Sequence, residues 1–231
     1  GHTVPLAVDF IPQTTVSRDV GEALTLPETV EVVYNDRSAN TQVPVSWDAS
    51  QVAAIDTKKA GTYTVDGTLS DGTAVTADVD VEMVNYVKNP GFEEADRSMW
   101  EISYAGENDP TDYQENAHDG DFSLHFWSDS DMDFSICQTL TDLPAGTYQL
   151  FAFAQGGDME STSDLELYAV INGEEIGSDA FMLTTWTDWK QPKVDNIRIG
   201  DGDTLTIGVR MKCNANSWGT IDDFTLNRIS D

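Results

Sequence analysis

Apolar and polar residues alternate one by one along most of the chain, in short runs separated by Gly, Asp, Asn and Pro. Alternation with a period of two places successive side chains on opposite faces of a β-strand. Runs of this kind that recur every 8–12 residues or so are typical of β-sandwiches. Helical periodicity is almost absent, so the pattern predicts an all-β protein.

The first third of the chain contains five such runs and one strong turn signal. The predicted strands cover residues 23–26, 30–34, 43–47, 61–65 and 75–81. Asp71-Gly72 predicts a two-residue hairpin turn, because both central positions of such a turn favour a positive φ. Together these elements fit a small seven-strand sandwich.

A boundary between two domains is expected near residues 85–89, where Asn89-Pro90-Gly91 interrupts the chain. We expect domains at 4–86 and 87–231. In the second domain the predicted strands cover residues 122–127, 132–140, 147–155, 165–171, 204–212 and 221–226. About 140 residues of strand without a helix indicate a jelly roll. The fold class predicted is therefore all-β, with an N-terminal Ig-like β-sandwich followed by a jelly-roll β-sandwich.

The chain is strongly acidic. Its 41 Asp and Glu against 12 Lys and Arg give a net charge of −29, of which −21 falls on residues 89–231. Binding to nucleic acid or to an anionic membrane surface is therefore not expected. No run approaches about 18 apolar residues, and the chain does not open on a charged segment followed by an apolar one, so neither a membrane span nor a signal peptide is predicted.

Known catalytic motifs are absent from the sequence. None of the three histidines lies in HExxH, and there is no GxSxG, GxGxxG or Walker loop. A catalytic pair of carboxylates stays an open alternative among so many acids. The two cysteines, Cys137 and Cys213, are too few for a disulfide framework or a CxxC site, and the sequence is consistent with one bridge or with two buried thiols.

Aromatic and polar positions of the second domain favour a carbohydrate ligand. Alternation places Arg210 and Lys212 on one face of their strand, an unexpected position for basic residues in so acidic a domain. Sugars present an apolar C–H patch that stacks on an aromatic ring and hydroxyls that polar side chains read. We expect one sheet face to be lined by Arg210 and Lys212 with His125, Trp127, Gln155 and Tyr168.

A calcium site is the second hypothesis about chemistry. Residues 129–133 resemble the start of an EF-hand loop, but Phe134 stands where that loop needs glycine. Oxygen ligands from separate segments, brought together at an end of the sandwich, fit Ca²⁺ better. The candidates are the Gly91 carbonyl, Glu93, the 116–121 turn with Asn116 and Asp119, and Asp222 or Asp223.

Eight motifs follow one another along residues 89–231: Asn89-Pro90-Gly91-Phe92-Glu93, Arg97-Ser98-Met99-Trp100, Asp112-Tyr113-Gln114, Ser123-Leu124-His125-Phe126-Trp127, Gln138-Thr139-Leu140, Gln155-Gly156-Gly157-Asp158, Trp186-Thr187-Asp188-Trp189 and Trp218-Gly219-Thr220-Ile221-Asp222-Asp223-Phe224. In this order they resemble the galactan-binding modules of carbohydrate-binding family 61, which accompany endo-β-1,4-galactanases of glycoside hydrolase family 53. The first and last motifs are shared by many jelly-roll sugar-binding modules and imply the fold and a structural Ca²⁺. The middle motifs imply β-1,4-galactan.

The first domain resembles the bacterial Ig-like domains appended to secreted glycosidases, on the strength of residues 43–47 and 60–65. Such domains usually act as spacers. The two resemblances together imply a secreted or cell-surface, monomeric and non-catalytic module. It would bind β-1,4-galactan or galacto-oligosaccharides and be covalently joined to an endo-β-1,4-galactanase catalytic domain.

The resemblance also implies particular site residues. For Ca²⁺ it supports Glu93 and Asp222 most. For the sugar it supports Gln155, Lys212, Asn214 and Trp218, with Asn216 in the same loop. Three alternatives stay open: a structural or adhesive surface module without a glycan ligand, a module for another plant glycan, and a catalytic jelly roll.

Overall fold

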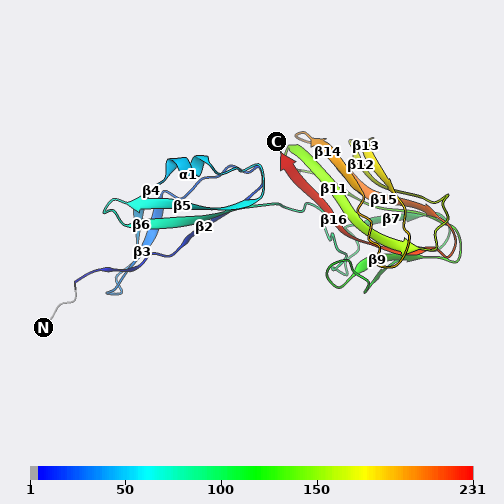
Figure 1. Ribbon diagram of the computed structural model, residues 1–231, viewed down its shortest axis with the longest axis horizontal. Coiled ribbons are helices and arrows are strands. Elements are labelled where there is room, and N and C mark those ends of the chain that lie inside the picture. Colours follow the sequence, from blue (N-terminus) through cyan, green and yellow to red (C-terminus); the bar gives the residue numbers. More distant parts are fainter. Residues whose placement is uncertain (1–4, 231) are drawn as a thin grey trace. The chain divides into compact units, whose positions relative to one another are not determined.

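The computed structural model describes residues 5–230, so the expected domain ends at Val4 and Asp231 lie outside the described range. Its contacts divide the chain into two compact units, with the boundary between Met83 and Val84. The described residues form sixteen strands and one short helix, which confirms the all-β class (Figure 1). None of the described helices is long and apolar enough to cross a membrane.

The first unit is one six-stranded sheet with the strand order β1-β3-β4-β5-β6-β2. Its elements are β1 (Val8–Phe10), β2 (Thr14–Asp19), β3 (Thr29–Tyr34), β4 (Thr41–Trp47), α1 (Ala49–Ala53), β5 (Gly61–Leu69) and β6 (Ala74–Glu82). The described part of this unit has six strands rather than the seven expected, and residues 23–26 are not a strand. Leu24 and Leu26 instead pack against Val65 and Val79 without joining a ladder.

Two local signals mark a turn and a helix start. The chain does turn between β5 and β6 at Asp71-Gly72, but the predicted two-residue turn is wrong: Leu69 and Thr73 pair, so the loop has three residues, 70–72. Only Gly72, at φ 89°, has a positive φ, whereas both residues were expected to. The short helix α1 was not predicted from periodicity, but Asp48 caps it by accepting hydrogen bonds from the backbone N–H groups of Ser50 and Gln51. A carboxylate at this position satisfies amide donors that a helix leaves unpaired at its start.

The second unit is a sandwich of two five-stranded sheets. The β15 sheet has the order β13-β12-β15-β10-β7 and the β16 sheet has the order β14-β11-β16-β9-β8. The strands are β7 (Glu101–Tyr104), β8 (Thr111–Gln114), β9 (Ser123–Trp127), β10 (Met132–Leu140), β11 (Gly146–Gly157), β12 (Asp164–Ile171), β13 (Glu174–Phe181), β14 (Lys193–Ile199), β15 (Leu205–Cys213) and β16 (Trp218–Ser230).

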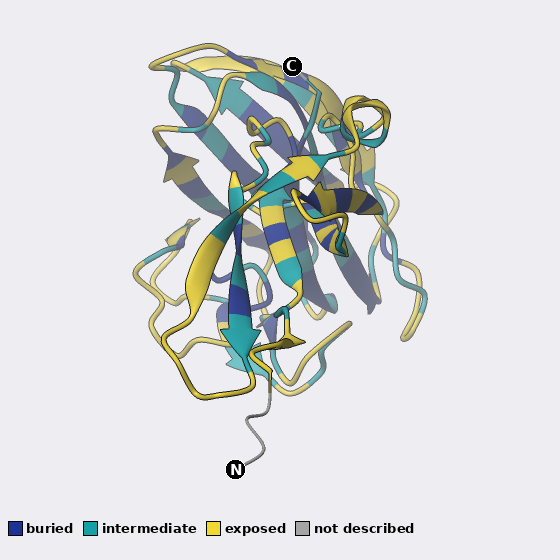
Figure 2. Ribbon diagram, turned by 90° about the vertical axis from the view of Figure 1, so that its left-hand side faces the viewer, coloured by how far each residue is buried: buried dark blue, intermediate teal, exposed yellow. Residues whose placement is uncertain are grey.

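One large core fills the space between these two sheets. Burial alternates along β10 and β15. Figure 2, coloured by burial, shows buried and exposed bands along strands of the chain. The alternation that predicted the strands is thus the division between a core face and an outer face. Side chains on the two outer faces are open to a ligand.

Residues 84–86 belong to the second unit, three residues before the boundary expected from sequence. The Asn85 side chain donates to the Phe224 carbonyl oxygen at 2.9 Å and accepts from the Leu226 N–H at 3.0 Å. The Tyr86 N–H donates to the Leu226 carbonyl oxygen at 3.0 Å. Asn85 and Tyr86 therefore extend the hydrogen bonding of β16, which a reading of turn residues alone does not detect.

The two cysteines are free thiols in the structure. Cys137 stands opposite Gly208 in the β10–β15 ladder, whereas Cys213 stands opposite Met132 at the end of the same ladder. Five residues of extended strand separate Gly208 from Cys213, or about 16 Å, which is far beyond the reach of a disulfide. The alternative of one bridge between them is therefore closed.

Candidate functional site

Three tryptophans gather on the outer face of the β16 sheet, and we call Trp127, Trp186 and Trp218 the tryptophan cluster. Trp127 and Trp218 stand directly opposite each other in the β9–β16 ladder. The rings of Trp186 and Trp218 have centroids 6.0 Å apart. Trp127 is 48% exposed and Trp186 is 49% exposed, an unusual amount of open indole surface. Rings held in this way offer a ready stacking surface.

The alternation of β9 explains how the cluster reaches the surface. Leu124 and Phe126 are fully buried in the core, so His125 and Trp127 point outward. Burial lowers the pKa of His125, although Asp112 on the neighbouring strand β8 partly opposes this effect. His125 is therefore a half-buried neutral side chain next to the tryptophan cluster at neutral pH.

Trp218 is held from below and at its edge. Gly157 lies beneath the indole, where a Cβ atom would come within 3.0 Å of the ring. The Trp218 Nε1–H donates to Asp158 Oδ2 at 2.9 Å. Glycine at position 157 thus makes room for the ring, and the hydrogen bond fixes its orientation. Asp158 was not among the candidate residues, although it closes the Gln155–Asp158 motif.

Two amide side chains that were expected to bind the sugar instead form hydrogen bonds within the protein. Gln155 is 2% exposed, and its Oε1 accepts from the Thr187 N–H at 2.5 Å. Asn214 Oδ1 accepts from the Glu160 N–H, and Asn214 Nδ2 donates to the Asp158 carbonyl oxygen, both at 2.8 Å. Both residues lie beside the tryptophan cluster, but their polar atoms hold the loops around it.

Asn216 and Trp186 complete the surroundings of the cluster. Asn216 is exposed with φ 67°, and its N–H donates to the Ser128 carbonyl oxygen at 2.8 Å, next to the end of β9. Trp186 comes from the loop between β13 and β14. The sequence contains Trp186 in the Trp186–Trp189 motif, but alternation does not show which of its two tryptophans faces outward.

The expectation that six residues line a single sheet face is wrong. His125, Trp127 and Gln155 belong to the β16 sheet, whereas Tyr168, Arg210 and Lys212 belong to the β15 sheet. Residues on outward positions of the two sheets of a sandwich face opposite directions. Period-two alternation specifies a side of a strand, but it does not specify to which of two sheets the strand belongs.

The residues on the β15 sheet have their own arrangement. Arg210 forms ion pairs with Glu166 and Glu175, and its guanidinium lies 4.9 Å from the centre of the Tyr168 ring. Its charge is therefore already compensated. Lys212 stands between Asp133 and Asp164 and lines an open groove of about 460 Å³.

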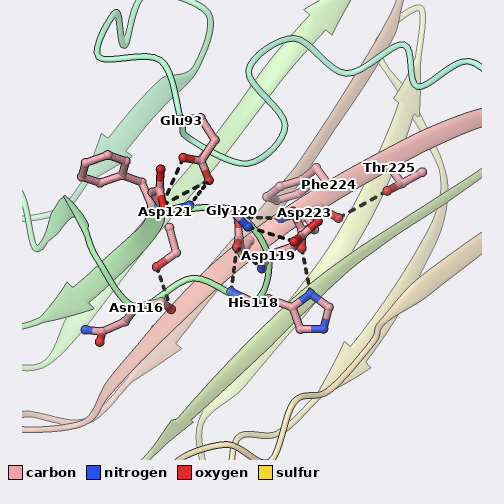
Figure 3. Close-up of polar contacts among 12 residues, drawn as sticks. Glu93, Asn116, His118, Asp119, Gly120, Asp121, Asp223, Phe224 and Thr225 are labelled. Carbon is pink, nitrogen blue, oxygen red and sulfur yellow. Dashed lines mark hydrogen bonds and ion pairs between the residues drawn. The ribbon is translucent and has the colours of Figure 1, made fainter.

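A second polar feature, which we call the carboxylate cluster, consists of Glu93, Asp119, Asp222 and Asp223. Figure 3 labels Glu93, Asp119 and Asp223 in this region. The Glu93 carboxylate accepts from the N–H groups of Asp121 and Phe122 at 2.9 and 3.1 Å. Asp222 Oδ2 accepts from the N–H groups of His118 and Asp119 at 2.8 and 3.3 Å. The 116–121 turn is therefore tied to acids from both ends of the unit.

The backbone of Gly91 lies against the same acids. A Cβ atom on Gly91 would be 3.4 Å from Asp223 Oδ1 and 3.6 Å from Asp222 Oδ1. Asn116 differs, because its side chain points away from the carboxylate cluster in Figure 3 while its carbonyl oxygen accepts from Ser123. The structure thus brings together Gly91, Glu93, Asp119 and Asp222 of the predicted set, with Asp223 beside them.

Asp222 is the most perturbed acid of this cluster. It is fully buried, and burial together with the charge of Asp223 raises its pKa to about 7. Burial also raises the pKa of Asp223, although the hydrogen bond between His118 Nδ1 and Asp223 Oδ2 at 2.7 Å opposes the effect. A buried carboxylate is the kind of group that a hard metal ion stabilises.

The geometry of the side chains alone does not form a metal site. Within residues 5–230, no three His, Cys, Asp or Glu side chains are placed to hold an ion by themselves. Calcium sites, however, also use backbone carbonyls and water. The all-oxygen donor set of Glu93, Asp119 and Asp222 beside the Gly91 backbone fits Ca²⁺ in chemistry.

The fold and the outer-face aromatic cluster define the class of carbohydrate-binding modules with a β-sandwich fold. One solved structure of this class is 32% identical to the chain: TmCBM61 in complex with β-1,4-galactotriose, with a TM-score of 0.56. The match covers 63% of this chain and 99% of that module. The chain accordingly belongs to carbohydrate-binding module family 61.

Other comparisons concern the first unit and more distant structures. The family model of the bacterial Ig-like domain (group 4) matches residues 11–73. A structure of promiscuous modules from the β-sandwich superfamily is 12% identical, covering 98% of this chain and 99% of that one, with a TM-score of 0.48. A xylan-binding CBM22-1 domain of Paenibacillus barcinonensis Xyn10C is 17% identical, covering 61% and 92%, with a TM-score of 0.44. No curated protein sequence matches the chain.

Proposed function

We propose that this chain binds β-1,4-galactan through the tryptophan cluster. The observation that carries the proposal is the Trp127–Trp218 pair, two indoles directly opposite each other on an outer sheet face with Trp186 beside them. A row of rings of this kind can take successive sugar units of one chain. The galactotriose bound by TmCBM61 supports the choice of ligand.

The chemistry of galactose suits such a surface. Its axial C4 hydroxyl leaves several C–H groups contiguous on the opposite side of the ring, and this apolar patch stacks on indole. The hydroxyls at the rim need acceptors and donors that are already fixed in place. Asp158 supplies a carboxylate beside Trp218, and Asn216 supplies an exposed amide. Stacking would give affinity, and these polar groups would give selectivity.

The biological role that follows is targeting. In this proposal the chain is secreted or displayed at a bacterial cell surface, and it holds an attached endo-β-1,4-galactanase close to its polymer. Weak binding suffices for this task, because attachment converts the second encounter into an intramolecular one. An individual dissociation constant of about 1 μM to 1 mM is expected.

Isothermal titration of the whole chain with β-1,4-galactotriose tests the proposal, with xylotriose and cellotriose as comparison ligands. Heat with galactotriose alone supports β-1,4-galactan, and heat with another oligosaccharide keeps a glycan-binding module while changing its ligand. If no ligand gives a heat of binding at millimolar concentration, the result would favour the alternative of a structural or adhesive module. Release of sugar from galactan by the chain itself would instead point to a catalytic jelly roll.

We also propose that the carboxylate cluster binds a structural Ca²⁺. Glu93, Asp119 and Asp222 would supply carboxylate oxygens and Gly91 its carbonyl oxygen, with Asp223 beside them. The ion would neutralise the buried charge of Asp222 and fasten the 116–121 turn to β16. A rise in the melting temperature on addition of Ca²⁺, reversed by EDTA, is the expected result, because a ligand of the native state alone adds stability.

A further inference from the structure

The loop between β13 and β14 is fastened to β11 at three points around Trp186. Lys190 and Ala154 exchange backbone hydrogen bonds, with N···O distances of 2.7 and 2.9 Å. At the second point the Ala152 N–H donates to the Pro192 carbonyl oxygen at 3.3 Å. Within the loop itself, Asp188 accepts from the Thr184 hydroxyl and pairs with Lys190 at 3.0 Å. The third point is the Thr187 N–H, which donates to Gln155 Oε1 at 2.5 Å. Of these, only the third is a side chain of β11.

Thr187 has a backbone conformation that needs such support. Its φ is 66°, in the left-handed region that β-branched residues rarely adopt. A residue of this kind persists only when its surroundings hold it in place. Gln155 is 2% exposed, so its side chain is itself fixed by the sheet. The fixed amide oxygen therefore holds the strained residue that immediately follows Trp186.

We propose that Gln155 is a positioning residue for the glycan site, acting through Thr187 to hold Trp186 against Trp218. This inference rests on the proposed function of the tryptophan cluster. In this arrangement Gln155 acts without touching the sugar, since its oxygen accepts from the Thr187 N–H and its side chain is buried. It fixes Trp186 before the sugar binds. The free energy of binding then contains no entropic cost for ordering the loop.

The acceptor role distinguishes Gln155 from a sugar-binding amide. In Gln155→Glu a carboxylate oxygen can still accept from the Thr187 N–H, whereas the NH₂ group that would donate to a sugar hydroxyl is gone. In Gln155→Leu the acceptor is removed and the shape is roughly kept. We expect Gln155→Leu to weaken galactotriose binding roughly tenfold, the effect of one lost buried hydrogen bond, and Gln155→Glu, which keeps the acceptor, to bind several-fold more tightly than Gln155→Leu.

Two further variants complete the experiment. Gln149→Leu is the matched control, because Gln149 also lies on β11 but bonds to Asp195, away from the tryptophan cluster. Thr187→Gly, combined with Gln155→Leu, removes the cost of the positive φ. We expect the control to bind as wild type and the double variant to recover part of the lost affinity. Melting temperatures of all variants identify any that fail to fold.

Acrylamide quenching of tryptophan fluorescence without ligand gives an independent readout. Gln155→Leu should increase quenching relative to wild type, the increase should vanish in a Trp186→Phe background, and Gln155→Glu should not show it. Wild-type affinity and quenching in Gln155→Leu would overturn the inference. Loss of binding in Gln155→Glu with unchanged quenching would overturn it in favour of direct contact. Absence of galactotriose binding by wild type would instead overturn the proposed function, while quenching would still test whether Gln155 holds Trp186.

Discussion

The indole N–H of Trp218 is donated to the carboxylate of Asp158 at 2.9 Å. Because the only polar atom of the indole is committed to a neighbour, Trp218 can offer a ligand nothing except its ring surface. Asp158 keeps unused acceptor capacity at the edge of that ring. The pair therefore combines an apolar surface for C–H groups with a fixed acceptor for a hydroxyl, which are the two elements of sugar recognition.

Substitutions of Trp218 should separate these two contributions. Trp218→Ala removes the stacking surface and is expected to abolish retention on a β-1,4-galactan affinity gel. Trp218→Phe keeps a ring but frees Asp158, so we expect an intermediate loss. Tyr104→Ala is the control, because Tyr104 is 41% exposed but belongs to the β15 sheet. Unchanged retention of Trp218→Ala would place the glycan elsewhere.

The central strands of the second unit could be predicted from sequence, and the edge strands could not. β10 and β15 have a core face and an outer face, so their residues alternate clearly. β13 is mostly exposed along its length, which removes the alternation. In β14 the left-handed Asn196 interrupts the strand, so that the core residues Val194 and Ile197 are three apart instead of two.

The site could be predicted only in part for a similar reason. Trp127 and Trp218 were recognised as candidates, but their direct opposition depends on the β9–β16 register, and these strands are far apart in the chain. Which of the two sheets a strand joins also depends on pairing between distant segments. Alternation therefore grouped Arg210 with Trp127, although Arg210 lies on the β15 sheet. Gln155 was recognised from its motif, yet its burial beneath Thr187 is a tertiary property that residue type does not reveal.

A substitution of Gly120 tests Ca²⁺ binding by the carboxylate cluster without removing any of the four acids. A Cβ atom at Gly120 would come within 2.1 Å of Glu93 Oε1, at φ 73°. Gly120→Ala should therefore displace the Glu93 carboxylate and suppress the stabilisation by Ca²⁺. Gly106 is the matched control, since it has φ 93° and no atom within 4 Å of the added Cβ. Each variant should lose about 1–2 kcal/mol from the left-handed conformation, whereas only Gly120→Ala should lose the calcium response in a thermal melt.

The cysteines give a prediction about redox state. Cys137 is half-buried, and Cys213 is buried in the core. Burial raises the pKa of both thiols, which lowers the thiolate fraction and hence their reactivity. We expect two thiols per chain in denaturant, slow labelling of Cys137 before Cys213 in the native protein, and a melting temperature that dithiothreitol does not change. A drop in melting temperature on reduction would contradict the free-thiol state.

Asp222 predicts how stability depends on pH. Its pKa is raised to about 7 in the folded chain from an ordinary value of 3.8, so the folded state binds its proton more tightly than the unfolded state. The stabilising effect of this proton is complete below the unfolded value and is lost as pH rises through about 7, a change of a few kcal/mol. In EDTA, therefore, the melting temperature should fall between pH 5 and pH 8.

Calcium should reverse this dependence, because the ion binds the ionised carboxylate. The increase in melting temperature caused by Ca²⁺ should then be small at pH 5 and large at pH 8. Asp222→Asn provides the control, since it keeps the shape and removes the titrating group. The variant should show only the general pH dependence of so acidic a chain and no response to Ca²⁺. An equal response to Ca²⁺ at both pH values, or an unchanged response in Asp222→Asn, would show that the ion binds without Asp222.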